Sequence, residues 1–156
     1  MRTCLRCNGE KYVERNGGEP GKDLCKECHG QGFLEGMEII NLILSGNPLS
    51  TQHIYRSVFR GKFPTVYMTK QGKNLEEQYR SEATNQYHGK VLTGDVEMGI
   101  FLFFQDKRRR DVDNYNKLVL DSLEGIIFED DKQIQKLTIV KGYSKENPRV
   151  EVNIYY

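Results

Sequence analysis

Residues 96–125 read VEMGIFLFFQDKRRRDVDNYNKLVLDSLEG, and the period of their hydrophobic pattern changes part-way along. In the first part every second residue is apolar, at Val96, Met98, Ile100, Leu102 and Phe104. Since apolar Phe101 and Phe103 fall between them, this pattern predicts a strand that is buried on one face and largely covered on the other. The second part has the spacing of a helix packed on a sheet, at Tyr115, Leu118, Val119, Ser122 and Leu123. Gly125 is expected to end this helix.

The flanking segments extend this pattern in both directions. Residues 37–44 form an apolar run of strand length before the turn residues 45–48, and residues 55–68 suit one or two short strands. A second helix is expected to start at Asn74, because Glu77 follows it three residues later as in a helix cap, and apolar residues then recur at every fourth position up to Tyr87. Residues 134–141 and 150–156 read as the last strands. The order predicts a mixed β-sheet with two helices, in the α/β or α+β class.

The first 36 residues form a separate module, and residues 37–156 are long enough for one catalytic domain. Two C-x-x-C pairs, 17 residues apart, lie in this module at Cys4, Cys7, Cys25 and Cys28. Four thiolates satisfy tetrahedral Zn²⁺ without an open position, so the spacing predicts a structural zinc site that replaces a missing apolar core. His29 as a ligand, a redox pair and a disulfide framework are the alternatives. The glycines beside the cysteines are similar to the knuckles of DnaJ-type chaperones.

Charge is nearly balanced, at +1 overall, but its distribution is uneven. An unbroken cationic run comprises Lys107, Arg108, Arg109 and Arg110, and a second basic group between residues 56 and 80 includes Arg56, Arg60 and Arg80. Both groups suit contacts to DNA phosphates, and the alternative is an ordinary solvated surface. No apolar run approaches the roughly 18 residues of a membrane span. The N-terminus lacks the apolar core of a secretion signal, so we expect a cytosolic protein with no membrane partner.

Acidic residues cluster around the second predicted helix. Asp111 and Asp113 precede it in a segment expected to be extended, where their side chains would point the same way and reach one Mg²⁺ ion. The alternative is that Asp113, Lys117 and Asp121 form ordinary ion pairs at helical spacing. Residues 129–131 are three adjacent carboxylates, which repel one another unless a cation or a turn relieves them.

The order of these elements resembles the RusA-type Holliday junction resolvases. The resemblance is carried by RRDVDN at 109–114, Lys117, LDSL at 120–123 and DDKQI at 130–134. It runs from about Met37 to the C-terminus and implies the family's mixed α/β fold, its homodimer and Mg²⁺-dependent nicking of four-way DNA junctions. By position, the resemblance implies that the metal-binding carboxylates are Asp111, Asp113 and Asp131 and that the active-site lysine is Lys117. Asn114, Asp121 and Asp130 match the motif with roles left open.

One segment departs from the family pattern. The family has a Pro-Pro-Ser-x-Asn loop after its first strand, whereas residues 48–52 of this chain read PLSTQ. Gln52 stands in place of the asparagine, which leaves the role of this loop open.

The sequence therefore predicts a Mg²⁺-dependent endodeoxyribonuclease that resolves four-way DNA junctions by paired symmetric nicks, in recombination and repair. Two rival functions are a non-catalytic, zinc-dependent DNA-binding or assembly protein and a DnaJ-like chaperone fragment. The second rival leaves the acidic motif unexplained. The sequence does not choose between Asp130 and Asp131 as the third metal ligand, and it leaves the role of the cysteine module open.

Overall fold

The computed structural model of the protein describes residues 2–3, 10, 12–14, 22–24, 33–34 and 38–156. The chain divides into two compact units, Met1–Glu38 and Ile39–Tyr156, and each is described by itself. In the first unit, β1 (Arg2–Thr3) pairs with β4 (Phe33–Leu34) and β2 (Tyr12–Glu14) with β3 (Lys22–Leu24), both antiparallel. The four cysteines and His29, and with them the predicted zinc site, lie outside the described residues.

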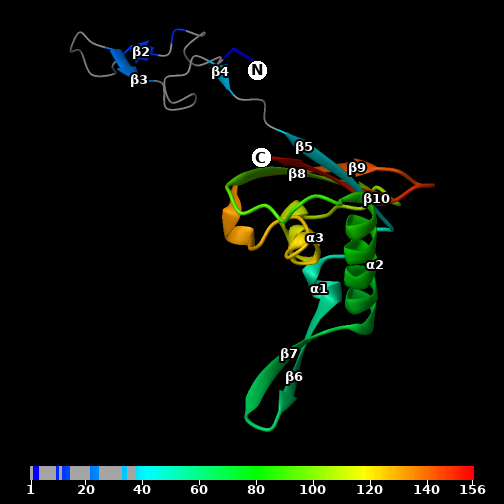
Figure 1. Ribbon diagram of the computed structural model, residues 1–156. Coiled ribbons are helices and arrows are strands. Elements are labelled where there is room, and N and C mark those ends of the chain that lie inside the picture. Colours follow the sequence, from blue (N-terminus) through cyan, green and yellow to red (C-terminus); the bar gives the residue numbers. More distant parts are fainter. Residues whose placement is uncertain (1, 4–9, 11, 15–21, 25–32, 35–37) are drawn as a thin grey trace. The chain divides into compact units, whose positions relative to one another are not determined.

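The second unit is built on a four-stranded mixed sheet with the order β5-β10-β8-β9 (Figure 1). Its strands are β5 (Ile39–Ser45), β8 (Val96–Phe104), β9 (Ile134–Tyr143) and β10 (Arg149–Tyr155). β10 runs antiparallel to both of its neighbours, whereas β8 and β9 are parallel. The predicted mixed sheet is confirmed, and the connection between its two parallel strands carries the acidic motif.

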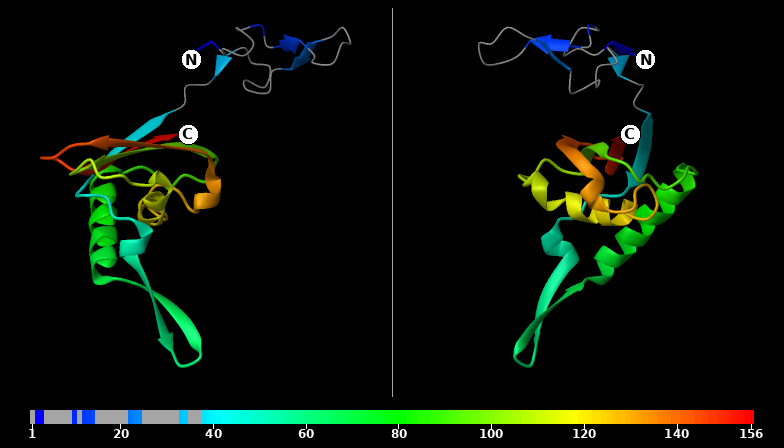
Figure 2. Two further views of the ribbon diagram at one scale, coloured as in Figure 1. Left: turned by 180° about the vertical axis from the view of Figure 1, so that it is seen from behind. Right: turned by 60° about the vertical axis from the view of Figure 1, so that its left-hand side comes forward.

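The alternating apolar residues of β8 are all buried, at most 2% exposed. They pack with the inward residues of β5 and β10 and with α3 (Asn116–Leu123), whose apolar stripe is buried as predicted. Helix α2 (Lys70–Gln86) and α3 lie on the same side of the sheet (Figure 2). Gly125 follows α3 with a φ of 76°, a conformation that glycine adopts without a Cβ penalty.

Helix α2 begins earlier than expected. The prediction of a start at Asn74 is wrong, because the hydroxyl of Thr69 accepts a hydrogen bond from the N–H of Gly72 at 3.1 Å and caps the helix there. Tyr79 and Ala83 are buried as the four-residue spacing indicated. The extra turn matters because it joins α2 directly to the segment that precedes it.

That preceding segment is a hairpin. The short helix α1 (Thr51–Ile54) leads into β6 (Tyr55–Arg60), which pairs with β7 (Phe63–Met68) across a turn at Gly61 with a φ of 70°. The hairpin extends away from the sheet and the helices of its unit (Figure 1). No helix in the described part of the chain is long and apolar enough to cross a membrane.

Candidate active site

Helix α3 places a lysine and an aspartate one turn apart beside the base of the hairpin. The Nζ of Lys117 lies 3.0 Å from the Oδ2 of Asp121, and the Oη of Tyr55 donates to the same carboxylate oxygen at 3.3 Å. The hydrogen bond to Asp121 raises the pKa of Lys117 above its ordinary value, so the pairing further favours the charged form of this lysine. Burial, followed by the charge of Asp121, raises the pKa of Tyr55, so its hydroxyl stays protonated.

Of the two aspartates predicted to lie in an extended segment, Asp111 does have an extended backbone, whereas Asp113 lies in a turn. Residues Val112–Asn114 form a 3₁₀ turn, η1, in which the N–H of Asn114 donates to the carbonyl of Asp111 at 3.3 Å. The chain therefore begins to turn between the two aspartates instead of continuing as a strand. Both side chains are exposed, and in the described part of the chain neither carboxylate has an ion pair or a side-chain hydrogen bond. They are unneutralised anionic oxygens.

The adjacent residues Asp130 and Asp131 have different surroundings. Asp130 caps the 3₁₀ turn η2 (Asp131–Gln133), and its carboxylate accepts from the backbone N–H and from the Nζ of Lys132, each at 3.0 Å. The backbone hydrogen bond is the main cause that lowers the pKa of Asp130. Asp131 is exposed and close enough to Lys117 to contribute to that lysine's raised pKa. The turn η2 therefore relieves part of the repulsion expected among the three adjacent carboxylates. It does so through hydrogen bonds to the carboxylate of Asp130 rather than that of Asp131.

The donor chemistry of this region suits a hard cation, but the carboxylates as placed do not form a three-ligand group. Among the described residues no three Asp, Glu, His or Cys side chains converge on one point. Since Mg²⁺ is commonly held by one or two carboxylates together with substrate phosphate oxygens, such a group is not required before DNA binds.

The cationic run 107–110 divides into inward and outward members. The guanidinium of Arg110 lies 2.7 Å from Asp106 and over the ring of Phe104, and its side chain is only 12% exposed. Arg108 contacts Asp106 at 3.5 Å but is 83% exposed, and the side chain of Arg109 is also exposed. Arg110 therefore stabilises the loop, while Arg108 and Arg109 remain accessible to DNA.

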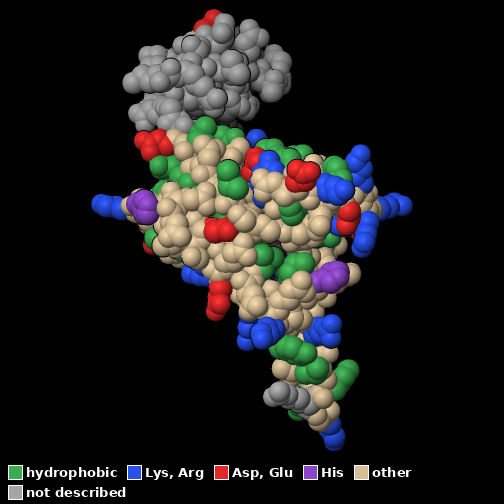
Figure 3. All heavy atoms as spheres, turned by 90° about the vertical axis from the view of Figure 1, so that its right-hand side faces the viewer, with side chains coloured by type: hydrophobic (Ala, Val, Ile, Leu, Met, Phe, Trp, Pro, Cys, Tyr) green, Lys and Arg blue, Asp and Glu red, His purple; other side chains and the backbone are tan. Residues whose placement is uncertain are grey.

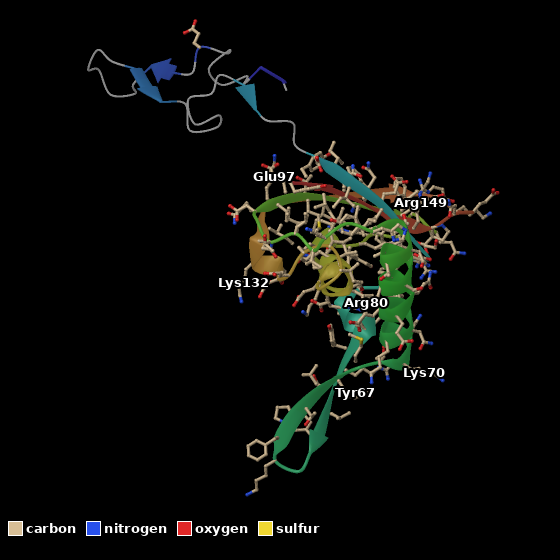
Figure 4. All side chains as sticks on the ribbon, in the orientation of Figure 1. Tyr67, Lys70, Arg80, Glu97, Lys132 and Arg149 are labelled. Carbon is tan, nitrogen blue, oxygen red and sulfur yellow. The ribbon has the colours of Figure 1, made fainter. Side chains whose placement is uncertain are left out.

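The remaining predicted basic residues also differ from one another. Arg56 is exposed on β6, Lys107 is exposed with its Nζ 5.1 Å from the ring centre of Tyr143, and the side chain of Arg60 lies outside the described part. Arg80, grouped with the basic patch by sequence, instead reaches α3 (Figure 4). It donates to the carbonyls of Asp121, Ser122 and Glu124 at 3.2–3.4 Å and so caps the end of that helix.

The loop that departs from the family pattern borders a small polar hollow of about 180 Å³. Its lining includes Ser50, His53, Asp106, Arg108 and Arg110. The Oγ of Ser50 lies 2.8 Å from the Nδ1 of His53. The side chain of Gln52 is exposed and has no hydrogen bond within the described residues, so the retained serine, not the substituted glutamine, organises this loop.

Sequence reasoning missed two residues of this region. Tyr55 fell in the segment 55–68, for which short strands but no role in the site were expected, although its place beside the basic Arg56 was a weak signal. Arg80 was read as a surface cation because nothing local to residue 80 reveals a helix end that lies 41 positions away. Asp121, whose role was open, proves to be the shared partner of Lys117 and Tyr55.

Comparison with known proteins identifies the family of the chain. The family model described as endodeoxyribonuclease RusA matches residues 46–155 of the chain, which include every aspartate discussed above. The chain belongs to the RusA family. It is accordingly an endodeoxyribonuclease, and the predicted fold class and enzyme class are confirmed. The matched region starts after residue 45 and does not include the cysteine module.

Two relatives align over most of their own length. The uncharacterized protein YqaN of Bacillus subtilis (strain 168) is 30% identical over 141 residues, covering 76% of this chain and 96% of that protein. The crossover junction endodeoxyribonuclease RusA of Aquifex aeolicus (strain VF5) is 29% identical over 123 residues, covering 78% of this chain and 95% of that protein.

Proposed function

We propose that this RusA-family nuclease nicks four-way DNA junctions in a Mg²⁺-dependent reaction. The observation that carries the proposal is the charge arrangement around α3. Lys117 forms an ion pair with Asp121 and lies in electrostatic range of Asp131. At the turn before α3, two further carboxylates, those of Asp111 and Asp113, have no cationic partner in the described part of the chain. Unneutralised carboxylates near a fixed cation suit a site that binds both a metal ion and a phosphodiester.

Asp111, Asp113 and Asp131 would hold the metal. When bound, Mg²⁺ supplies Lewis-acid polarisation of the scissile phosphate and neutralises charge that develops on its oxygens. Asp130 is not assigned to this set, because its carboxylate already accepts two hydrogen bonds from Lys132. The 3₁₀ turn η1 has long hydrogen bonds of 3.3 Å, so a modest adjustment of that turn can bring Asp111 and Asp113 together.

The chain's own contribution to the reaction comes from Lys117. Its ammonium group provides positive charge for the phosphorane-like transition state, and its effect is greatest if its position is fixed beforehand. Asp121 holds the lysine and is itself fixed by Tyr55. Tyr55 and Asp121 are thus positioning residues for Lys117.

Cationic side chains near the site would contact flanking phosphates. We assign this role chiefly to Lys107, Arg108 and Arg109, with Arg56 and Arg60 on the hairpin, whereas Arg110 acts by bracing the loop. A homodimer would place two sites about a two-fold axis, which suits paired symmetric nicks in recombination and repair. A structural Zn²⁺ at the four cysteines remains part of this proposal, on the strength of their spacing.

The direct test is cleavage of a synthetic four-way junction by the purified full-length protein with and without Mg²⁺. Asp111→Asn, Asp113→Asn and Asp131→Asn should each reduce the nicking rate by about a hundredfold or more, because each removes a ligand whose metal contributes several kcal/mol. Circular dichroism should show an unchanged fold, since all three side chains are exposed.

Asp130→Asn is the matched control. Asparagine is as good a helix cap as aspartate, so this variant should nick within a few-fold of the wild type. If Asp130→Asn is as inactive as Asp131→Asn, the assignment of the third ligand is wrong. If the wild type binds the junction but never nicks it with Mg²⁺, the chain is a non-catalytic DNA-binding protein.

A further inference from the structure

The β6–β7 hairpin carries large apolar side chains that nothing in its unit covers. Phe59 and Phe63 are 78% and 77% exposed, and Val66 and Tyr67 are also exposed. Figure 3 shows these apolar side chains, with lysine and arginine among them, along the part that projects below the body. Exposed aromatic residues in such number are unusual on a soluble surface and mark a binding site.

The register of the hairpin gives its tip an aromatic ring on each face. Phe59 lies opposite Pro64 and Phe63 lies opposite Arg60. Because successive residues of a strand point to opposite faces and paired residues share a face, Phe59 and Phe63 project from opposite faces. Arg60 and Phe63 are the last pair of the hairpin, and only the turn residues Gly61 and Lys62 lie beyond them. The tip is therefore a narrow wedge with a ring on both sides.

The charge of the hairpin favours a nucleic acid as its partner. Between Tyr55 and Met68 the sequence contains three cationic residues, Arg56, Arg60 and Lys62, and no acidic residue. Lys70 and Lys73 extend the positive charge into the exposed first turn of α2 (Figure 4). Two such hairpins would repel each other. Alternating cations and aromatic rings suit phosphates and unstacked bases.

The base of the hairpin is rigid and adjoins the candidate active site. The N–H and the hydroxyl of Thr69 donate to the carbonyls of Ile54 and His53, at 2.7 and 3.0 Å. A Cβ on Gly72 would lie 2.8 Å from the side chain of Ile54, so helix and hairpin pack without spare room. Tyr55, the first residue of β6, is the one that holds Asp121. The base of the hairpin is thus anchored beside the carboxylate that pairs with Lys117.

We propose that this hairpin is the element that recognises branched DNA. Its tip enters the branch point, Phe59 and Phe63 stack on the bases exposed there, and the cations contact the adjoining phosphates. Strands of six residues reach roughly 20 Å, enough to extend from the site into the centre of a junction. The inference rests on the proposed function, because it concerns how the same nuclease selects its substrate.

The test measures binding rather than cleavage, in buffer without magnesium, so that the DNA stays intact. The probes are a synthetic four-way junction with 2-aminopurine at its branch point and a linear duplex of the same length. Full-length wild type should raise the 2-aminopurine fluorescence, because an unstacked base is less quenched. The double variant Phe59→Ser/Phe63→Ser should lose this rise and bind the junction roughly ten- to a hundredfold more weakly, with duplex affinity unchanged within twofold.

Two further variants sharpen the result. Phe59→Tyr/Phe63→Tyr keeps both rings and should retain the fluorescence rise and the affinity. Ile43→Ser/Val140→Ser removes apolar side chains that are 53% and 44% exposed on the sheet, and should leave junction selectivity unchanged.

Several outcomes overturn the inference. They are a wild type that raises no fluorescence, a serine variant that binds the junction normally, and equal losses on junction and duplex, which would indicate groove binding. A serine variant that changes the molecular mass in sedimentation would instead identify the hairpin as a self-association arm. If the wild type raises the fluorescence at the branch point but never nicks the junction with Mg²⁺, the proposed nuclease function is wrong and the inference about DNA binding by the hairpin stands.

Discussion

Single residues in this protein gain their roles from the turns in which they lie. Asp130 and Asp131 are chemically identical neighbours, yet the capping box of η2 engages the first and leaves the second exposed near Lys117. In the same way, the adjacent Arg109 and Arg110 differ because only Arg110 can lie over Phe104 and reach Asp106. The position of one residue in a short segment therefore decides whether its side chain is engaged within the protein or left exposed.

Tyr79 provides a test at this scale. Its ring is 1% exposed, and its hydroxyl has no hydrogen-bond partner in the described part of the chain. Burial raises the pKa of this phenol, which reflects the same unfavourable desolvation. Tyr79→Phe removes an unsatisfied polar group and keeps the packing, so the free energy of unfolding should rise by about 1 kcal/mol. Urea denaturation measures it, and a loss of more than about 1 kcal/mol would show that the hydroxyl has a partner.

At the scale of elements, helix α2 protects the edge of the sheet that strand β5 forms. The side chain of Gln86 accepts from the N–H of Ile43 at 2.9 Å and donates to its carbonyl at 2.7 Å. One and two turns earlier, Glu82 and Gln78 bind the N–H and the carbonyl of Ser45. Because residues four apart share a helix face, three polar side chains replace a neighbouring strand along β5.

Gln86→Ala should weaken this protection. The variant loses both hydrogen bonds to Ile43, so the free energy of unfolding should fall by about 1 kcal/mol. An exposed strand edge also promotes association, so light scattering at high concentration should increase. Asn85→Ala, at an exposed neighbouring position whose side chain has no hydrogen bond within the described residues, is the control and should change stability by less than about 0.5 kcal/mol. Equal effects of the two substitutions would contradict the edge role.

At the scale of the whole molecule, the small net charge of +1 conceals two cationic regions with different expected roles. The run at 107–109 lies on the loop that leads into η1, and the hairpin carries the second group. Phosphate contacts add affinity without distinguishing DNA structures, whereas contacts to exposed bases discriminate. The two regions should therefore divide affinity and selectivity between them.

The double variant Arg108→Gln/Arg109→Gln tests this division. Loss of two phosphate contacts should weaken binding to junction and linear duplex alike and reduce the slope of log affinity against log salt by roughly two. Titrations at several salt concentrations measure this slope. Lys90→Gln/Lys145→Gln removes two exposed cations elsewhere on this unit and should leave the slope nearly unchanged. A change confined to the junction would contradict a phosphate-binding role for the arginines.

The sequence by itself determined every element whose burial follows a local period. The alternation in β8, the stripe of α3 and the glycine that ends it could be predicted, because hydrophobic periodicity depends only on neighbouring residues. The ordered acidic motif identified the family and its chemistry for the same reason, since its members lie within 25 residues of one another, from 109 to 134.

Only the tertiary structure decided which distant groups meet. Tyr55 reaches Asp121 across 66 positions, and Arg80 caps a helix end 41–44 positions away. Such contacts depend on how elements pack, and a periodic pattern contains no information about that. The same holds for η1, where an extended segment was expected: the chain must turn from a strand end into α3, and this turn begins between Asp111 and Asp113. The local hydrophobic period thus determined the helices and strands, and tertiary packing determined which side chains meet in the candidate site.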